Sequence, residues 1–125
     1  MPVLHIIALA QPDPRRIDAA LAGAAFAIAE AYGCKPEQVW VTWQEIKPSH
    51  YVEGSTKARV QPRDSHPPFA ELLCFEGKSP EVIEATLVAA ANAITTALEI
   101  PGNVFVSYRD LQSGRVIAGD NLVRR

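Results

Sequence analysis

Residues 14–31 read PRRIDAALAGAAFAIAEA and residues 80–97 read PEVIEATLVAAANAITTA, and a shift of about 66 positions lays the first stretch on the second. Nine positions then carry the same residue in both, namely Pro14, Ile17, Ala19, Leu21, Ala24, Ala25, Ala27, Ile28 and Ala31 in the first stretch. Alanine-rich helices inflate identity between unrelated segments, so the flanking segments decide whether the chain contains a repeat.

The flanking segments also recur, in the same order. Residues 3–9 and 69–75 are apolar runs of strand length, and a turn-like segment follows each. Ser79-Pro80 offers a side-chain cap and a proline at the first helical position, and Asp13-Pro14 offers the same chemistry in the first half. We therefore expect each half to contain a strand that leads into a helix.

Apolar side chains recur every three or four residues in both stretches, which predicts one buried face for each helix. Gly33 and the pair 101–102 are expected to end the helices. Second strands are predicted over Gln38–Trp43 and Asn103–Tyr108, which are rich in Val, Trp, Phe and Tyr. Each half is then a β-α-β unit with a right-handed crossover, and the chain is a two-layer α+β protein.

Length and composition predict a single domain over residues 1–125, with pseudo-repeats at about 2–54 and 68–125 joined by a loop at about 52–68. The net charge is −2 and the basic residues form no run, so we expect neither a nucleic acid nor a membrane partner. No long uncharged apolar stretch and no signal-like amino terminus is apparent, which predicts a cytoplasmic protein. Its two cysteines are expected to be thiols and to bind no metal.

The segment Met1-Pro2-Val3, together with VWVTWQEIKPSHY at residues 39–51, resembles the tautomerase superfamily. Each half looks like one subunit of 4-oxalocrotonate tautomerase, and the chain looks like the fused two-unit members, which include malonate semialdehyde decarboxylase, cis-3-chloroacrylic acid dehalogenase and macrophage migration inhibitory factor. The match is ungapped from Pro2 to about Gly54 and looser in the second half. The resemblance implies a four-stranded mixed sheet backed by two helices, a homotrimer, and an active site at the amino-terminal proline without any cofactor.

Pro2 carries the catalytic role that this resemblance implies. Initiator methionine is readily removed before proline, which exposes a secondary amine. An α-amino group titrates near about 7.7–8, and apolar burial or nearby cations lower its pKa. The neutral amine serves as a general base, and the protonated amine serves as a general acid. Pro68 occupies the matching place in the second half, but its nitrogen is an internal amide, so one site per chain is expected.

Substrates of the family are small keto or unsaturated acids, whose carboxylates are held by arginines. This sequence has Pro12, Trp40 and Phe105 where the resemblance predicts cations, and only Lys78 keeps a positive charge. Lys78 is therefore a candidate for binding the substrate carboxylate, with a solvated lysine as the alternative. Trp40 and Trp43 are an odd number of residues apart and face opposite sides of a strand. One of them is expected to line the site and the other to pack under a helix.

Tyr51 stands at the place of the family's aromatic wall residue, with His50 before it, and both are candidate substrate-binding residues. An interface aromatic and a surface histidine are the alternatives. Arg115 is a further candidate, as a replacement for the missing cations. The other arginines at positions 15, 16, 59 and 63 are expected to face solvent. The run 64–66 contains Asp, Ser and His, but neighbours in sequence do not form a catalytic triad, and we interpret it as loop.

Three hypotheses remain open at this stage. The first is a tautomerase that uses Pro2 as general base on a small 2-keto or unsaturated acid. The second keeps the amine as a general acid for hydration, dehalogenation or decarboxylation of a three-carbon acid. Gln38 replaces the aspartate that the decarboxylases carry, and no glutamate lies near Ala118, so the first hypothesis leads. The third is a non-catalytic trimer, since a retained Met1 leaves Pro2 as an amide.

Overall fold

The computed structural model describes residues 1–124, and Arg125 lies outside the described part. The elements, in chain order, are β1 (Val3–Leu9), α1 (Arg15–Tyr32), a short 3₁₀ helix η1 (Pro36–Gln38), β2 (Trp40–Ile46), β3 (Val52–Glu53), β4 (Thr56–Lys57), β5 (Phe69–Phe75), α2 (Pro80–Leu98), β6 (Phe105–Leu111), β7 (Val116–Ala118) and β8 (Asn121–Val123). The predicted bounds of the first strand in each half are confirmed.

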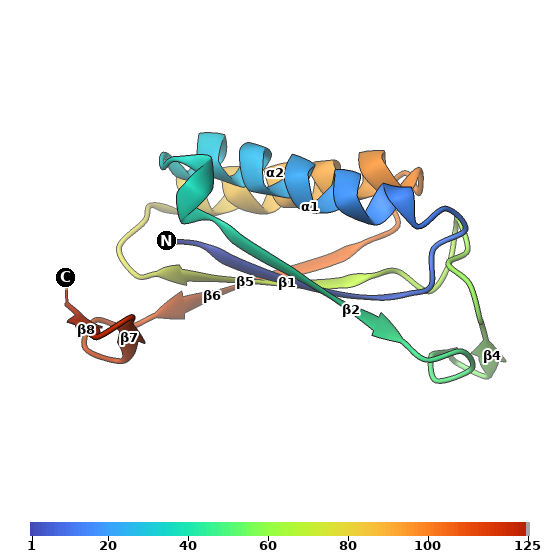
Figure 1. Ribbon diagram of the computed structural model, residues 1–125. Helices are drawn as coiled ribbons and strands as arrows, with labels where there is room; N and C mark the ends of the chain where they lie inside the picture. The colour runs from blue at the N-terminus through green and yellow to red at the C-terminus, as the bar shows by residue number, and fades with distance from the viewer. Residues whose placement is uncertain (125) are drawn as a thin grey trace.

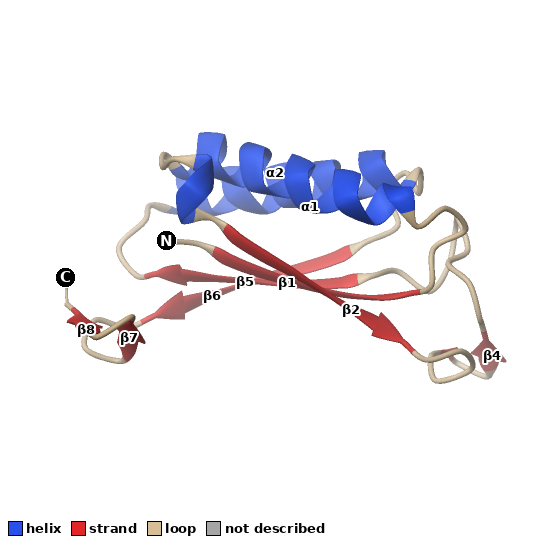
Figure 2. Cartoon of the chain, in the orientation of Figure 1, coloured by secondary structure: helices blue, strands red, loops and turns tan. Residues whose placement is uncertain are grey.

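The main sheet has the strand order β2-β1-β5-β6. β1 pairs in parallel with β2, β5 pairs in parallel with β6, and β1 and β5 are antiparallel neighbours at the centre. Both helices cover one face of this sheet, as Figure 2 shows. The predicted α+β class, with two tandem β-α-β units in a four-stranded mixed sheet backed by two helices, is confirmed.

The core lies between the helices and the covered face of the sheet. The two central strands contribute Leu4, Ile6, Ala70 and Leu72, and the helices contribute Ala24, Ile28, Ala90 and Ile94. Alanine at the facing positions lets the two helices pack closely on each other and on the sheet. The apolar residues that recur every three or four positions in the sequence therefore form the faces that the helices bury.

α2 has the length and apolar composition of a membrane-spanning helix, with a mean hydropathy of 1.3. Its sheet-facing residues Ala90, Ile94 and Leu98 are buried in the domain, and Glu81 stands in its first turn. Only 28% of this apolar stretch is buried, so packing in the core accounts for part of its composition.

The helix ends follow the capping chemistry of the sequence in part. The Ser79 hydroxyl accepts a hydrogen bond from the Val82 backbone N–H at 3.3 Å. In the first half Pro14 takes the cap position, and Asp13 instead accepts from the Arg15 N–H at 3.0 Å. At the other ends, Gly33 and Glu99 are both left-handed C-caps.

The second strand of each half begins and ends later than the sequence predicts. β2 covers Trp40–Ile46 instead of Gln38–Trp43, and β6 covers Phe105–Leu111 instead of Asn103–Tyr108. In the first half residues 36–38 form a 3₁₀ helix, and parallel pairing then continues to the end of β1, where Leu9 meets Ile46. The register with the neighbouring strand, and not the local composition, sets these bounds.

The second face of the sheet has no helix over it (Figure 1). Several large apolar side chains lie on it, and Trp40, Phe69 and Phe105 are about half exposed there. Two hairpins extend beyond opposite ends of the sheet. β3–β4 arises from the linker, which the sequence indicates only as loop, and β7–β8 follows β6.

Candidate active site

Pro2 directly precedes the central strand β1, and its side chain is almost fully buried. Its carbonyl accepts a hydrogen bond from the Trp40 backbone N–H at 3.0 Å, which starts the parallel pairing with β2. The antiparallel register that places Val3 opposite Leu73 puts Pro2 beside Cys74. The amine that would form on removal of Met1 thus stands at the edge of the core.

Cys74 and Tyr108 provide neutral polar groups at this end of the core. Burial raises the pKa of the Cys74 thiol, although the nearby Tyr108 hydroxyl and the charge of the amino terminus act in the opposite direction. Burial also raises the pKa of the Tyr108 hydroxyl, and the interaction with Cys74 adds to this. Both groups therefore stay protonated at neutral pH. Sequence reasoning missed Tyr108, although its alternation with Val106 in a predicted strand is a signal for the covered face.

Lys78 precedes α2 and extends across to the end of α1. Its ammonium nitrogen donates to the Tyr32 carbonyl at 3.2 Å and lies 4.3 Å from the centre of the Tyr32 ring. The carbonyl end of a helix and an aromatic face both attract a cation. β5 runs antiparallel to β1 and ends at Phe75, shortly before Lys78, whereas β1 begins directly after Pro2, so Lys78 and Pro2 share one end of the domain.

Trp40 and Trp43 lie on opposite faces of β2, as the sequence predicts. Trp43 packs against the core under the helices, whereas Trp40 pairs with Val3 and lies half exposed on the open face. The Trp40 backbone contacts Pro2, and its side chain lies on the other side of the sheet from the helices.

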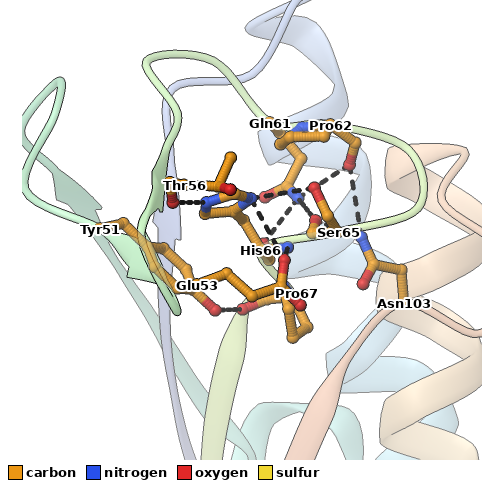
Figure 3. Close-up of polar contacts among 9 residues, drawn as sticks. All are labelled: Tyr51, Glu53, Thr56, Gln61, Pro62, Ser65, His66, Pro67 and Asn103. Carbon is orange, nitrogen blue, oxygen red and sulfur yellow. Dashed lines mark hydrogen bonds and ion pairs between the residues drawn. The ribbon is translucent and has the colours of Figure 1, made fainter.

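Tyr51 and His50 lie at the opposite end of the sheet from Pro2 within one chain. The Tyr51 ring stacks on Phe69 at a centroid distance of 5.5 Å and meets His66 edge-on at 5.0 Å. Its hydroxyl donates to the Pro67 carbonyl at 2.7 Å, as Figure 3 shows. Burial, followed by the charge of Glu53, raises the pKa of this hydroxyl. Only a second copy of the chain could bring Tyr51 to a Pro2 site.

Arg115 lies in the turn between β6 and β7, at the same end of the sheet as Pro2 (Figure 1). It is exposed, and its backbone N–H donates to the Gln112 carbonyl at 3.1 Å. Arg109, a second choice for the missing cation, pairs with Glu71 at 3.0 Å on the open face. Lys78 is therefore a candidate cation that Tyr32 holds in place at the Pro2 end of the domain.

His66 is buried in the linker at the end of the sheet opposite Pro2, and Figure 3 shows its contacts. Its Nε2 lies 2.8 Å from the Thr56 carbonyl, which only accepts, so Nε2 carries the hydrogen. Its Nδ1 then accepts from the Ser65 hydroxyl at 2.9 Å, and its backbone N–H donates to Glu53. Asp64 pairs with Arg63 and takes no part, so no triad forms. The network orders the linker.

Among residues 1–124, no group of three His, Cys, Asp or Glu side chains is placed to hold a metal ion. The site as described consists of Pro2, the neutral hydroxyl and thiol beside it, and the ammonium of Lys78. This set supports proton transfer next to a bound carboxylate.

Comparison with solved structures places the fold. An asymmetric trimer of a fused 4-OT covers 96% of this chain and 94% of its own with a TM-score of 0.85 at 17% identity. The structure of Pt0534 inactivated by 2-oxo-3-pentynoate has a TM-score of 0.84 at 17% identity, and the match covers 97% of this chain and 94% of Pt0534. Malonate semialdehyde decarboxylase has a TM-score of 0.73 at 17% identity, and the match covers 94% of this chain and 90% of the decarboxylase chain.

No protein-family model matches the sequence. No curated protein sequence matches it either. At these identities the structural likeness establishes the fold and not the activity. The chain has the fold of the fused 4-OT and malonate semialdehyde decarboxylase structures, so the fold that the resemblance implies is confirmed.

The two cysteines give a direct test of this end of the core. Cys34 is partly exposed and Cys74 is buried with a raised pKa, so we expect one fast-reacting thiol in the native protein and two after unfolding. Ellman's reagent at pH 8 measures this, and Cys34→Ser should abolish the fast phase. Two fast thiols in the native protein would contradict the burial of Cys74 beside Pro2.

Proposed function

We propose that the protein is a tautomerase-like enzyme that interconverts the enol and keto forms of a small 2-keto or unsaturated carboxylic acid. The observation that carries this proposal is the position of Pro2, buried at the start of the central strand and at the same end as Lys78. Removal of Met1 is required, because the Pro2 nitrogen is an amide until then.

The reaction needs only a base and a carboxylate anchor. The neutral Pro2 amine takes the proton from the enol hydroxyl, the oxygen becomes a carbonyl, and the new ammonium returns a proton to the carbon at the far end of the double bond. The apolar surroundings of Pro2 favour the neutral amine before the reaction. Lys78 holds the carboxylate with a charge-assisted hydrogen bond.

The solved structures support the general class of this proposal. Malonate semialdehyde decarboxylase is described with decarboxylase and hydratase activities. Pt0534 is inactivated by 2-oxo-3-pentynoate, a 2-oxo acid. A small keto acid as substrate is therefore proposed for this chain by analogy, and Pro2 as the reacting group follows from the resemblance of its first residues. We further propose a cytoplasmic location.

A homotrimer is part of the proposal. The fused 4-OT structures that this chain resembles are trimers. The open face of the sheet carries Trp40, Phe69 and Phe105 in an exposed position, which is the composition of a face that another copy covers. Such a trimer would also supply Tyr51 of one copy to Pro2 of the next.

Pro2→Ala should lower kcat for phenylenolpyruvate and 2-hydroxymuconate by about 10²- to 10⁴-fold, the usual contribution of a positioned general base. Intact mass must first show that Met1 is absent from both proteins. An unchanged rate in Pro2→Ala, with the oligomeric state preserved, rules out the amine as the base. An activity that rises at low pH, where the amine is protonated, favours the hydratase or decarboxylase alternative.

Lys78→Gln should raise KM for the same substrates by about 10- to 100-fold, because loss of a hydrogen bond to a charged group costs roughly 1.5–3 kcal/mol. Steady-state kinetics measure this effect, and kcat should change less. Lys57→Gln is the matched control, since Lys57 is exposed on the β3–β4 hairpin. A KM equal to that of the native protein would mean that Lys78 only caps the end of α1 and does not bind the substrate.

Phe105→Glu should convert the proposed trimer to monomers, because it places a charge in the apolar part of the open face beside Phe69. Sedimentation velocity measures the change, and circular dichroism confirms that the variant is folded. Val88→Glu is the matched control: Val88 on α2 and Phe105 are both 57% exposed, but Val88 lies on the helix side. A Phe105→Glu protein that stays trimeric would place the interface elsewhere.

A further inference from the structure

The internal repeat gives the molecule two ends with the same backbone. At one end the Pro2 carbonyl accepts from the Trp40 N–H, and at the other end the Pro68 carbonyl accepts from the Phe105 N–H, both at 3.0 Å. Both prolines are almost fully buried. Each place around Pro2 therefore has a counterpart around Pro68.

The helix ends extend this correspondence. The Cys34 N–H donates to the Ala29 carbonyl at 2.9 Å, and the Ile100 N–H donates to the Thr95 carbonyl at 3.0 Å. The residues before them, Gly33 and Glu99, are left-handed C-caps. Counted the same way, Leu98 corresponds to Tyr32 and Pro12 corresponds to Lys78.

The counterpart of the Pro2 end is an open cleft of about 310 Å³. The repeat contributes Pro12, Leu98, Glu99 and Ile100 to its wall, and the linker contributes further residues. A second hollow of about 550 Å³ adjoins it and shares Arg63 and Glu99. The end of the molecule that cannot form an amine thus has a cavity.

The charged side chains that line this cleft are two arginines and one carboxylate, that of Glu99. Arg16 lies 3.1 Å from Glu99 and is only 30% exposed, which corrects the expectation that it faces solvent. Arg63 has only a loose 3.7 Å pair with the neighbouring Asp64, and both side chains are largely exposed. A guanidinium binds a carboxylate through two parallel hydrogen bonds. The cleft therefore has a spare cation for a monoanion.

Gln61 gives an independent indication of a ligand. The residue lines the cleft, and only 6% of its surface is exposed. Its Nε2 donates to the carbonyls of Pro62, Ser65 and His66. Its Oε1 is buried and has no hydrogen-bond partner among residues 1–124. A buried acceptor without a partner is costly, and a hydroxyl donor would remove that cost.

We propose that this cleft is a second, non-catalytic binding site for a small 2-hydroxy acid or the enol form of a 2-keto acid. Arg63, with Arg16 beside it, binds the carboxylate, and Gln61 Oε1, which a small shift of its side chain uncovers, accepts from the hydroxyl. No reaction follows there, because the Pro68 nitrogen is a tertiary amide without basicity. The site is independent of the Pro2 amine, so it survives if the proposed activity fails.

Titration of the ¹⁵N-labelled native protein with sodium L-lactate tests the site through backbone amide shifts. We expect saturable shifts at Arg63, Glu99 and Ile100, which line the cleft, and weaker binding of propionate, which lacks the hydroxyl. Arg63→Gln should raise Kd about tenfold, whereas Arg59→Gln, exposed in the same linker but outside the cleft, should not change it.

Pro2→Ala should bind lactate at these amides as the native protein does, which separates this site from the proposed reaction. The site is overturned if the shifts do not saturate, if sodium chloride at the same ionic strength reproduces them, if they appear only around Lys78, or if Arg63→Gln binds lactate unchanged. Equal affinity for lactate and propionate overturns the recognition of the hydroxyl by Gln61.

Discussion

The antiparallel pairing of β1 with β5 is the interaction on which the rest of the structure depends. It joins the two β-α-β units into one sheet, with Val3 opposite Leu73 and Ile7 opposite Phe69. A slip of one residue in this register would turn Leu4 and Leu72 away from the helices and expose them. The same pairing sends the two prolines to opposite ends of the sheet, so the molecule has two ends by construction.

The two ends have the same backbone and different chemistry. Beside Pro2 the cation Lys78 rests on Tyr32, and the groups next to the proline are neutral. Beside Pro68 the linker folds over the end of the sheet and is ordered through buried His66. This asymmetry follows from chain connectivity, because only the first proline can become an amine. The second end forms no such amine, and Arg16 and Arg63 line the cleft there.

The sequence predicts the elements of this fold better than its site. Val3–Leu9 and Phe69–Phe75 are largely apolar, because these central strands are covered by helices and by neighbouring strands, so their bounds are clear. β2 is an edge strand with Thr42 and Gln44 on its open face. Because its second half contains polar residues, the sequence does not indicate where the strand ends. Contacts between distant segments leave no mark in the sequence.

Two contacts illustrate this limit. The ammonium of Lys78 meets Tyr32 across 46 positions, and no local pattern indicates that meeting. Pro2 and Tyr51 belong to the two segments that carry the resemblance, but the sheet separates them in space, since β2 starts beside Pro2 and runs away from it. Arg16 lies on the first turn of a helix whose partner, Glu99, is fixed only by the packing of α1 on α2.

This separation of Tyr51 from Pro2 makes assembly and chemistry depend on each other in the proposed enzyme. The open face that would bury against other copies is not uniformly apolar. His5 forms a hydrogen bond with Thr42 and lies opposite Glu71, which pairs with Arg109. Apolar residues flank this polar band on both sides, with Trp40 near Pro2 and Phe69 near Tyr51. In the proposed trimer a neighbouring copy would have to offer polar groups to this band, because its polar side chains lose their hydrogen bonds to water on burial. The band therefore restricts the register in which copies dock, and that register decides which Pro2 each Tyr51 reaches.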